Sequence, residues 1–407
     1  MNADVVVIGG GVVGAACAYF LSRRGLVVTL VEKGGISQGT SSRCDGNVLL
    51  IDKMPGYDCR LAGLSQELFP LVAAELDSDI EWRRRGSLLV IESEAELAVA
   101  DDFCRRLRKE GVPVRMMDAR EIHEDEPHLA EGVLGGMEAS CDGSVNPMAL
   151  AWGLTKGATR HGAVIRSHTA VSGIVKNVAG GVCGVETDAG TIATPRVVNA
   201  AGIWAEEIGR MAGVRVPVSP RQGQILVGER TRPVARRKVM EFGYLMAKFG
   251  AGDYQRNVTP EMEAYGIAFV FEPTPAGNFL VGSSRRFVGR DTNCHPPLLA
   301  AMAARSINFF PVLREMRVIR TYAGLRPFTP DHFPIVSDTP VPGFYVCAGH
   351  EGDGIGLSLI SGKLIGQIIC GEETDIDVTP LRLDRFGEAG TKKREMGIRK
   401  EERGKRK

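Results

Sequence analysis

Three glycines near the start of the chain have the spacing of a phosphate-binding turn. Gly9, Gly11 and Gly14 follow a short β-branched run at residues 4–8 and precede an Ala-rich stretch at residues 15–24 that is typical of a helix. In such a turn the first glycine permits a tight bend, the second lets the backbone approach a pyrophosphate, and the third lets helix and strand pack closely. With Val12 and Val13 inside the turn, the pattern predicts a dinucleotide-binding unit.

An acidic residue stands where such a unit needs one. A second predicted strand at residues 26–31 ends at Glu32, about twenty residues after the glycines, which is the place of the acid that binds the ribose hydroxyls. Lys33 follows it and is a further candidate contact. NAD and FAD enzymes share this acid, so these residues alone leave the identity of the dinucleotide open.

Two later segments could complete the nucleotide site. The polar loop at residues 34–47 could line the phosphates or be a simple surface connection. Residues 194–204 are typical of a buried strand that ends in a turn of small residues, where a second nucleotide contact is expected. The candidate contacts are Thr40, Ser41, Ser42, Arg43 and Asn47 in the first segment and Ala200, Ala201, Gly202 and Trp204 in the second.

A third glycine-rich turn lies near the C-terminus. Residues 343–349 predict a strand, and a helix is expected at about residues 355–370. Unpaired N–H groups at the start of that helix would stabilise negative charge on a bound ring. The candidate contacts here are Gly352, Asp353, Gly354, Ile355, Gly356 and Leu357.

Two further side chains are candidates for catalysis. Among seven histidines only His350 lies beside a glycine-rich turn, although a structural role is the alternative. Tyr244 could offer a hydroxyl to a substrate or could pack in the core. No histidine pair has metal-ligand spacing with a carboxylate, and the nine cysteines form no CxxC pair, so we expect no metal site.

Composition sets the broad class of the protein. With 407 residues, 44% hydrophobic residues and a formal net charge of +1, the chain suits two domains and no nucleic-acid partner. Scattered cysteines, and the lack of a signal peptide or of a long apolar run, predict a cytoplasmic protein without a transmembrane segment. The end of the chain carries nine Lys or Arg and three Glu in residues 391–407, and we predict a disordered basic tail at 388–407.

The middle of the chain predicts two local structures. Residues 164–192 alternate strand-like runs with turns, which indicates a three-stranded antiparallel insert. Asn146 and Pro147 are an N-cap and first-turn pair for a helix at residues 148–161.

Four ordered motifs together resemble the D-amino-acid oxidase superfamily. They are GGGVVG at the start, VVNAAGIWA in the middle, TYAGLRPFTPDHFPIV at residues 321–336, and CAGHEGDGIGLSLISGKLIG after it. The nearest resemblance is to glycine oxidase and to the β subunits of heteromeric sarcosine, proline, hydroxyproline and opine dehydrogenases. It implies a non-covalent FAD and an α/β fold, in which a Rossmann-like FAD-binding domain is interleaved with a smaller α+β substrate domain on a mostly antiparallel sheet. The implied ranges are 1–75, 145–215 and 320–380 for the FAD-binding domain and 76–144 and 216–319 for the substrate domain.

The resemblance also implies site roles. The arginine of the GLRP motif, here Arg326 after Gly324, would bind the substrate carboxylate and contact the cofactor, with a structural ion pair as the alternative reading. Two departures limit the analogy. No arginine follows His350, so a second cationic substrate contact is absent there, and Asn146 stands where related β subunits carry the histidine of a covalent FMN. Covalent FMN is not expected, although an FMN could lie at a subunit interface.

The resemblance implies oxidation of the C–N bond of a small amino or secondary amino acid by hydride transfer to flavin N5. Proline-like compounds, hydroxyproline, sarcosine or glycine, and opines are the candidate substrates. We expect the chain to be the β subunit of a heteromeric dehydrogenase that passes electrons to a flavoprotein or iron–sulfur subunit. The alternatives are a stand-alone oxidase that produces hydrogen peroxide and a non-catalytic flavin-binding structural subunit.

Overall fold

A six-stranded sheet occupies one half of the molecule. The computed structural model describes residues 2–245, 256 and 258–387, so the predicted basic tail at 388–407 lies outside the described residues. The strand order is β18-β19-β12-β1-β2-β8, and all neighbours are parallel except β18 and β19. The strands are β1 Val5–Ile8, β2 Val28–Val31, β8 Val164–Arg166, β12 Val197–Asn199, β18 Ile335–Asp338 and β19 Phe344–Ala348.

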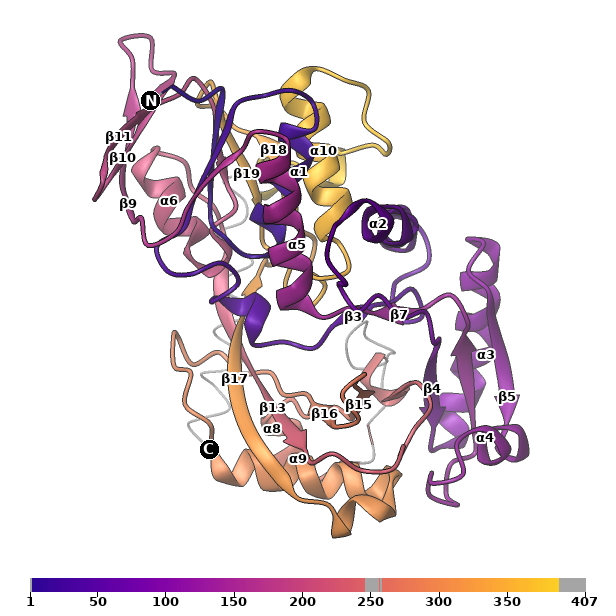
Figure 1. The fold of residues 1–407 in the computed structure, drawn as a ribbon. Helices are drawn as coiled ribbons and strands as arrows, with labels where there is room; N and C mark the ends of the chain where they lie inside the picture. Colours follow the sequence, from indigo (N-terminus) through magenta and orange to yellow (C-terminus); the bar gives the residue numbers. More distant parts are fainter. Residues whose placement is uncertain (1, 246–255, 257, 388–407) are drawn as a thin grey trace.

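Both faces of this sheet are covered. Val5 and Val7 of β1 are buried in the cluster that holds α1, whereas Val6 and Ile8 are buried in the cluster that holds β10 and β11. Such two-sided burial explains why these strands are continuous apolar runs. Helices α1, α5 and α10 lie side by side on one face (Figure 1). The covering elements on this face are α1 Val12–Ser22, α2 Tyr57–Glu75, α5 Pro147–Arg160 and α10 Ser358–Cys370.

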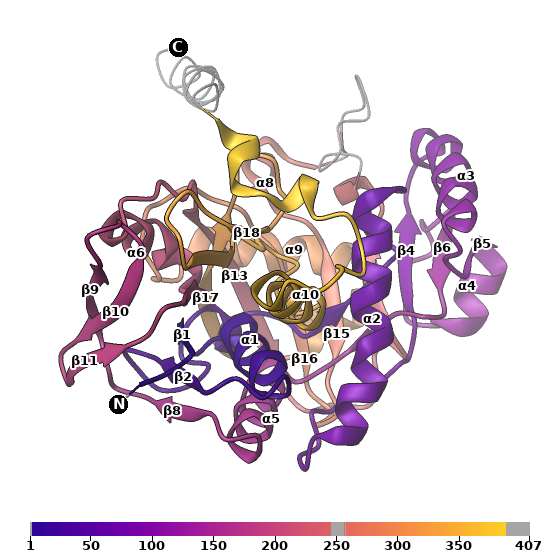
Figure 2. The ribbon, with the colours of Figure 1, turned by 90° about the horizontal axis from the view of Figure 1, so that it is seen from above.

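The other face carries a separate three-stranded antiparallel sheet, which lies together with helix α6 on one side of the molecule in Figure 2. Its strands are β9 Val171–Lys176, β10 Val182–Thr187 and β11 Gly190–Ala193, and α6 is Ala205–Met211. The predicted insert is therefore present, but its predicted start at residue 164 is wrong. Val164–Arg166 pairs in parallel with β2, and that pairing depends on contacts far away in sequence.

The second half of the molecule is an eight-stranded sheet in the order β17-β13-β16-β15-β14-β4-β6-β5. All neighbours are antiparallel except β14 and β4. The two longest strands, β13 and β17, extend from this sheet toward the six-stranded sheet (Figure 1). The strands are β4 Ser87–Ile91, β5 Val114–Asp118, β6 Gly135–Ala139, β13 Ser219–Gly228, β14 Lys238–Glu241, β15 Val270–Pro273, β16 Phe279–Gly282 and β17 Val318–Phe328. The mostly antiparallel sheet agrees with the expected fold, whereas the expected domain ranges stay a prediction.

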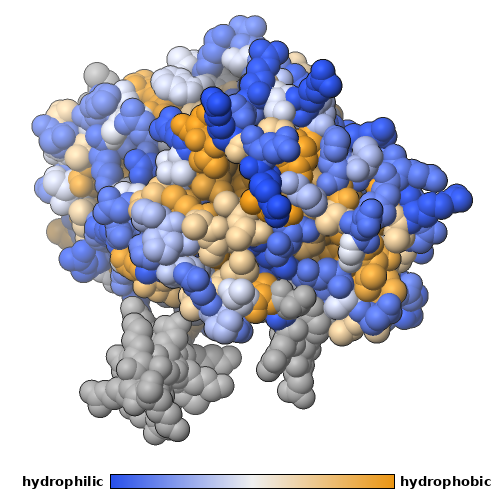
Figure 3. Space-filling view, turned by 90° about the horizontal axis from the view of Figure 1, so that it is seen from below, coloured by the Kyte–Doolittle hydropathy of each residue, from blue (hydrophilic) through white to orange (hydrophobic). Residues whose placement is uncertain are grey.

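Helices and short elements complete the fold. Helix α9 packs along one side of the eight-stranded sheet, and α3 and α4 cover its far end (Figure 1). These helices are α3 Glu94–Lys109, α4 Ala119–Asp125, α8 Pro260–Ala264 and α9 Pro296–Phe309. The 3-10 turns are Thr40–Ser42, Gly202–Trp204, Pro311–Glu315, Thr379–Leu381 and Leu383–Phe386. In the described part of the chain no helix is long and apolar enough to cross a membrane. The face in Figure 3 is mainly hydrophilic, with hydrophobic residues in patches between polar ones.

A buried carboxylate joins the two halves. Strands β3 Asn47–Val48 and β7 Gly143–Ser144 form a small ladder between the sheets. Beside it, Asp142 accepts hydrogen bonds from the backbone N–H of Leu50 at 2.7 Å and from the Ser87 hydroxyl at 2.6 Å. Asp142 is completely buried, and burial raises its pKa to about 6. The donors therefore hold this carboxylate at the junction between the two sheets.

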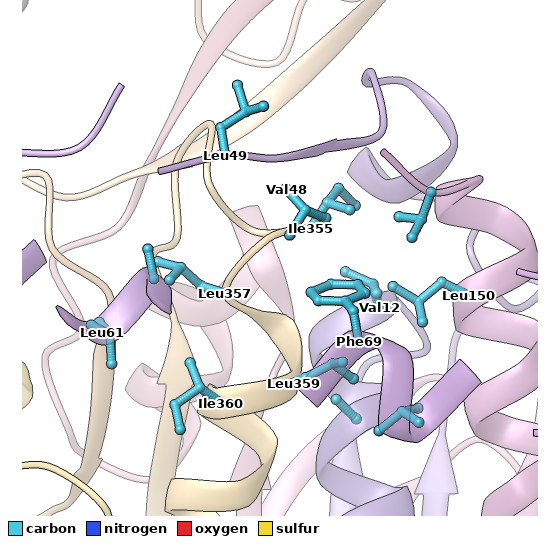
Figure 4. Close-up of a cluster of buried hydrophobic side chains, with 14 of the residues drawn as sticks. Val12, Val48, Leu49, Leu61, Phe69, Leu150, Ile355, Leu357, Leu359 and Ile360 are labelled. Atoms are coloured by element: carbon cyan, nitrogen blue, oxygen red, sulfur yellow. The ribbon is translucent and has the colours of Figure 1, made fainter. Parts of the chain in front are cut away.

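A continuous hydrophobic cluster lies under the predicted nucleotide turns. Figure 4 shows Phe69 of α2 close to Val12 of α1 and Leu150 of α5, with Leu359 of α10 nearby. Helix α5 begins as predicted, because the Asn146 side chain accepts hydrogen bonds from the N–H groups of Met148 and Ala149 at 3.1 Å each. The packing of these helices fixes the starts of α1 and α10 beside the strand ends.

Candidate active site

A cavity of about 420 Å³ runs along the carboxyl ends of the parallel strands. In an open parallel sheet, ligands bind beyond the carboxyl ends of the strands. Most of the predicted cofactor contacts line it, from every segment singled out in the sequence. They are Gly9, Gly11, Val12, Val13, Glu32, Lys33, Thr40, Ser41, Arg43, Ala200, Ala201, Gly202, Trp204, Gly324, Arg326, Gly352, Gly354 and Ile355.

The glycine turn has the close approaches that its spacing predicts. Gly9 has φ +117°, and a Cβ there would lie 2.5 Å from the carbonyl oxygen of Ala200. A Cβ on Gly14 would lie 1.9 Å from the carbonyl oxygen of Gly9. Helix α1 starts immediately after Gly11, and the Ser41 hydroxyl accepts a hydrogen bond from the Val12 N–H at 3.0 Å. The turn therefore brings the helix N-terminus, with its positive dipole end, to the cavity.

Glu32 and Lys33 mark the end of the cavity beside β2. The Glu32 carboxylate accepts hydrogen bonds from the N–H groups of Gly10 at 2.7 Å and Gly34 at 2.8 Å. Lys33 Nζ lies 3.4 Å from the ring centroid of Trp204. These contacts hold Glu32, the predicted ribose contact, and Trp204, from the segment predicted to make a second nucleotide contact, at one end of the cavity.

The remaining predicted cofactor contacts lie elsewhere. Gly14 and Ser42 line neither cavity, and Gly14 instead packs α1 against the turn. A second cavity, of about 80 Å³, adjoins the first and is lined by Asn47, Asp353, Gly356 and Leu357. The candidate Tyr244 lines this smaller cavity, whereas the candidate His350 lines the larger one.

Arg326 lines both cavities. Its guanidinium lies over Gly223 of β13, where a Cβ would be 2.4 Å from Nη1, and Nη1 donates a hydrogen bond to the carbonyl oxygen of Ser284 at 2.8 Å. Burial lowers its pKa from the usual value, and nearby acids, Asp45 foremost, oppose this. Among the described residues, no carboxylate forms an ion pair with Arg326, so the ion-pair alternative has no support in this part of the chain.

His350 is buried and neutral. Its Nε2 lies 2.9 Å from the hydroxyl of Ser361 on α10, and burial lowers its pKa to about 4. At neutral pH the ring therefore carries no charge. This environment suits a hydrogen-bonding role that orients the turn before α10 better than a role in which the ring gains a proton.

Sequence reasoning missed four charged residues of the site. Lys53 lies between Asp52, at 2.8 Å, and Asp353, with which it is also paired. Arg221 is paired with Glu351, and Glu351 also contacts His332 Nδ1 at 2.8 Å. The missed residues are Lys53, Arg221, Arg285 and Glu351. The signal at Lys53, Arg221 and Arg285 was a charged residue near an apolar run, which is too common to be informative, whereas Glu351 lies within the glycine-rich turn after His350.

Arg285 is the missed residue with the clearest consequence. It follows β16, lines the smaller cavity, and its guanidinium carbon lies 4.1 Å from the ring centroid of Tyr244. Burial lowers its pKa well below the usual value, and the positive charges of Arg326 and Arg221 lower it further. The structure therefore brings two cationic side chains, Arg285 and Arg326, to one small cavity.

The fold and the turn geometry define a dinucleotide-dependent protein with a second cavity beside the dinucleotide site. Residues 4–368 match the model of the DAO family, described as FAD dependent oxidoreductase. The chain belongs to this family. The expected fold and the resemblance to the D-amino-acid oxidase superfamily are confirmed, and the cofactor is FAD.

Individual relatives agree with this assignment. The chain is 28% identical to hydrogen cyanide synthase subunit HcnC of Pseudomonas protegens, over 96% of this chain and 98% of that protein. It is 29% identical to glycine oxidase of Geobacillus kaustophilus, over 95% and 98%, and the crystal structure of that enzyme superposes with a TM-score of 0.83, at 26% identity over 94% and 98%. Sarcosine oxidase subunit beta of Rhizobium meliloti is 26% identical, over 94% and 88%.

The residues of the larger cavity fit FAD. Gly9 and Gly11 line the cavity at the N-terminus of α1, where glycines let the backbone approach a pyrophosphate closely. Glu32, the predicted ribose contact, lines the cavity together with residues 200–204. Asn146, the position of the covalent FMN in the related β subunits, caps α5 and lines neither cavity.

Proposed function

We propose that this chain oxidises the C–N bond of a small amino or secondary amino acid whose carboxylate is bound by Arg326. One observation carries the proposal. Arg326 lines both the cavity that fits FAD and the smaller cavity beside it, and no described carboxylate neutralises it by an ion pair. A guanidinium binds a carboxylate through two parallel hydrogen bonds, which fixes the neighbouring carbon in one orientation.

Three residues of the chain would then have separate roles in the reaction. When bound, FAD supplies a two-electron acceptor that takes up a hydride. Arg326 orients the substrate, and Tyr244 lines the same small cavity and could donate its hydroxyl to the carboxylate. His350 stays neutral and holds the turn before α10 through Ser361. The small size of the cavity favours glycine, sarcosine, proline-like compounds, hydroxyproline or a small opine.

The proposal includes assembly into a heteromeric dehydrogenase. Its support is the similarity to HcnC and to sarcosine oxidase subunit beta, both of which are named as subunits and are covered over most of their length. The partner would be a flavoprotein or iron–sulfur subunit that accepts the electrons. An FMN would belong at that interface and would not be attached at Asn146, whose side chain caps α5.

The similarity to glycine oxidase favours a second candidate, a stand-alone oxidase that reduces oxygen to hydrogen peroxide. Peroxide formation by the isolated, FAD-loaded chain with its substrate would support this candidate. Reduction of the flavin without matching peroxide would favour the heteromeric dehydrogenase.

The test is anaerobic bleaching of the flavin with a panel of glycine, sarcosine, proline, hydroxyproline, D-amino acids and opines. We expect one chemical group of compounds to bleach wild-type protein and Arg326→Ala to lose this response while it keeps FAD. Arg320→Ala is the matched control, because Arg320 is exposed on the same strand. Wild-type rates in Arg326→Ala would contradict the proposal and favour a non-catalytic, flavin-binding structural subunit.

A further inference from the structure

The acids and the arginines around the smaller cavity differ in whether they form ion pairs with the described residues. The acids that line it are already engaged by cations: Lys53 pairs with Asp52 and Asp353, and Arg221 pairs with Glu351. The fourth acid, Asp45, lies 3.4 Å from the ammonium of Lys238. The carboxylates at this cavity therefore have partners within the protein.

The two arginines that line the smaller cavity, Arg285 and Arg326, have no such ion-pair partner among the described residues. In residues 2–245, 256 and 258–387, no carboxylate lies within ion-pair distance of Arg285 or Arg326. Arg326 donates a hydrogen bond to the carbonyl oxygen of Ser284, the residue that precedes Arg285. Burial lowers the pKa of Arg285, and the positive charge of Arg326 lowers it further. Two like charges in a space shielded from water repel each other, and bound anions relieve this repulsion.

The setting of Arg285 favours a ligand over a structural role in an ion pair. Its guanidinium is stacked on Tyr244 and opens into the cavity, while the adjacent Arg286 lies over Tyr265, at 5.6 Å, and lines neither cavity. Stacking on an aromatic face leaves the edge of a guanidinium free to form paired hydrogen bonds. Arg285 is therefore oriented by Tyr244, and its guanidinium forms no hydrogen bond to the residues that the structure describes.

We propose that Arg285 and Arg326 each bind one carboxylate of a single substrate, so that the substrate is a small secondary amine with carboxylates on both sides of its nitrogen. This inference rests on the proposed function and narrows it to N-(carboxyalkyl) amino acids. Arg326 holds the carboxylate next to the carbon that is oxidised, and Arg285 holds the other. Arg285, which follows β16, would thus be the second cationic substrate contact that the segment after His350 lacks.

A matched pair of ligands that carry no C–N bond tests this by binding alone. Thiodiacetate has two carboxylates around a sulfur atom, and (methylthio)acetate has one. Calorimetric titration of the FAD-loaded chain should show that wild-type protein prefers thiodiacetate by about tenfold or more. Arg285→Gln should remove this preference and change the affinity for (methylthio)acetate by less than about threefold, whereas Arg326→Gln should weaken both ligands.

Arg286→Gln is the control and should behave as wild type. Arg285→Lys, which keeps the charge without the planar fork, should retain part of the preference and serves as the second variant if Arg285→Gln loses FAD. Equal affinity of wild-type protein for the two ligands, no binding of either, or equal weakening of both by Arg285→Gln would overturn the inference. Bleaching by a monocarboxylic amino acid in those cases would show that the proposed function itself still stands.

Discussion

Arg221 and Arg326 stand directly opposite each other on the antiparallel strands β13 and β17. Residues in this relationship project from the same face of a sheet, and like charges there destabilise it. The two arginines differ in their ion pairs, because Glu351 is paired with Arg221 and no described carboxylate is paired with Arg326. In the proposed function, Glu351 neutralises Arg221, and Arg326 remains for the carboxylate of the substrate.

Gly223→Ala should displace Arg326. The new Cβ would lie 2.4 Å from Arg326 Nη1, so the guanidinium must move out of its place. A misplacement of about 1 Å costs on the order of 10²-fold, and we expect kcat/KM for the amino acid that bleaches the flavin to fall by about this factor. Steady-state kinetics measures the effect. The double variant Gly223→Ala/Arg326→Ala should be no worse than Arg326→Ala, and additive losses would contradict this mechanism.

Gly14→Ala should reduce FAD binding. The added Cβ would be 1.9 Å from the backbone carbonyl oxygen of Gly9. Because this atom belongs to the backbone, the clash can be relieved only if α1 moves away from β1. We expect the purified variant to carry much less FAD than wild-type protein, as measured by the ratio of flavin to protein absorbance. Gly63→Ala is the control, since Gly63 lies within α2 with nothing within 4 Å of its added Cβ. Full FAD content in Gly14→Ala would show that the turn tolerates a side chain.

His350 should make stability depend on pH. Its pKa is about 4 in the folded chain and near 6.5 when unfolded, so the unfolded state binds more protons between these values. Stability from this group is complete above pH about 6.5 and is lost as pH falls toward 4, by about 3 kcal/mol in total. His350→Gln should flatten the fall of Tm between pH 6.5 and 4.5. An unchanged slope would mean that other groups cause it.

Asp142→Ala should be strongly destabilising. It would leave the buried N–H of Leu50 and hydroxyl of Ser87 without their acceptor. Unsatisfied buried donors and the lost packing predict a loss of about 3 kcal/mol, seen as a clear decrease in Tm. Asp101→Ala removes only an exposed ion pair with Arg105 and should change stability by less than about 0.5 kcal/mol. Similar Tm values for the two variants would refute the assigned role of Asp142.

Local backbone requirements made part of the site predictable. The glycine turn and the Asn146 cap depend on neighbours within a few residues, and both have the expected geometry. Arg285 was not predicted because it reaches the cavity only through the pairing of β13 with β16 and β17. The same reason explains the error at Val164–Arg166, since a short apolar strand does not specify in which sheet it will pair.

The order of strands in the six-stranded sheet has a consequence for how the chain folds. β1 lies between β2 and β12, and β12 also pairs with β19 at residues 344–348, so β12 is far in sequence from both β1 and β19. Long-range pairing is slow because loop-closure entropy must be overcome before contacts form. The glycine turn therefore comes early in the sequence, yet its sheet can form fully only once β19 is available to pair with β12. Until then the edge of β12 is exposed to wrong pairing and to chaperones.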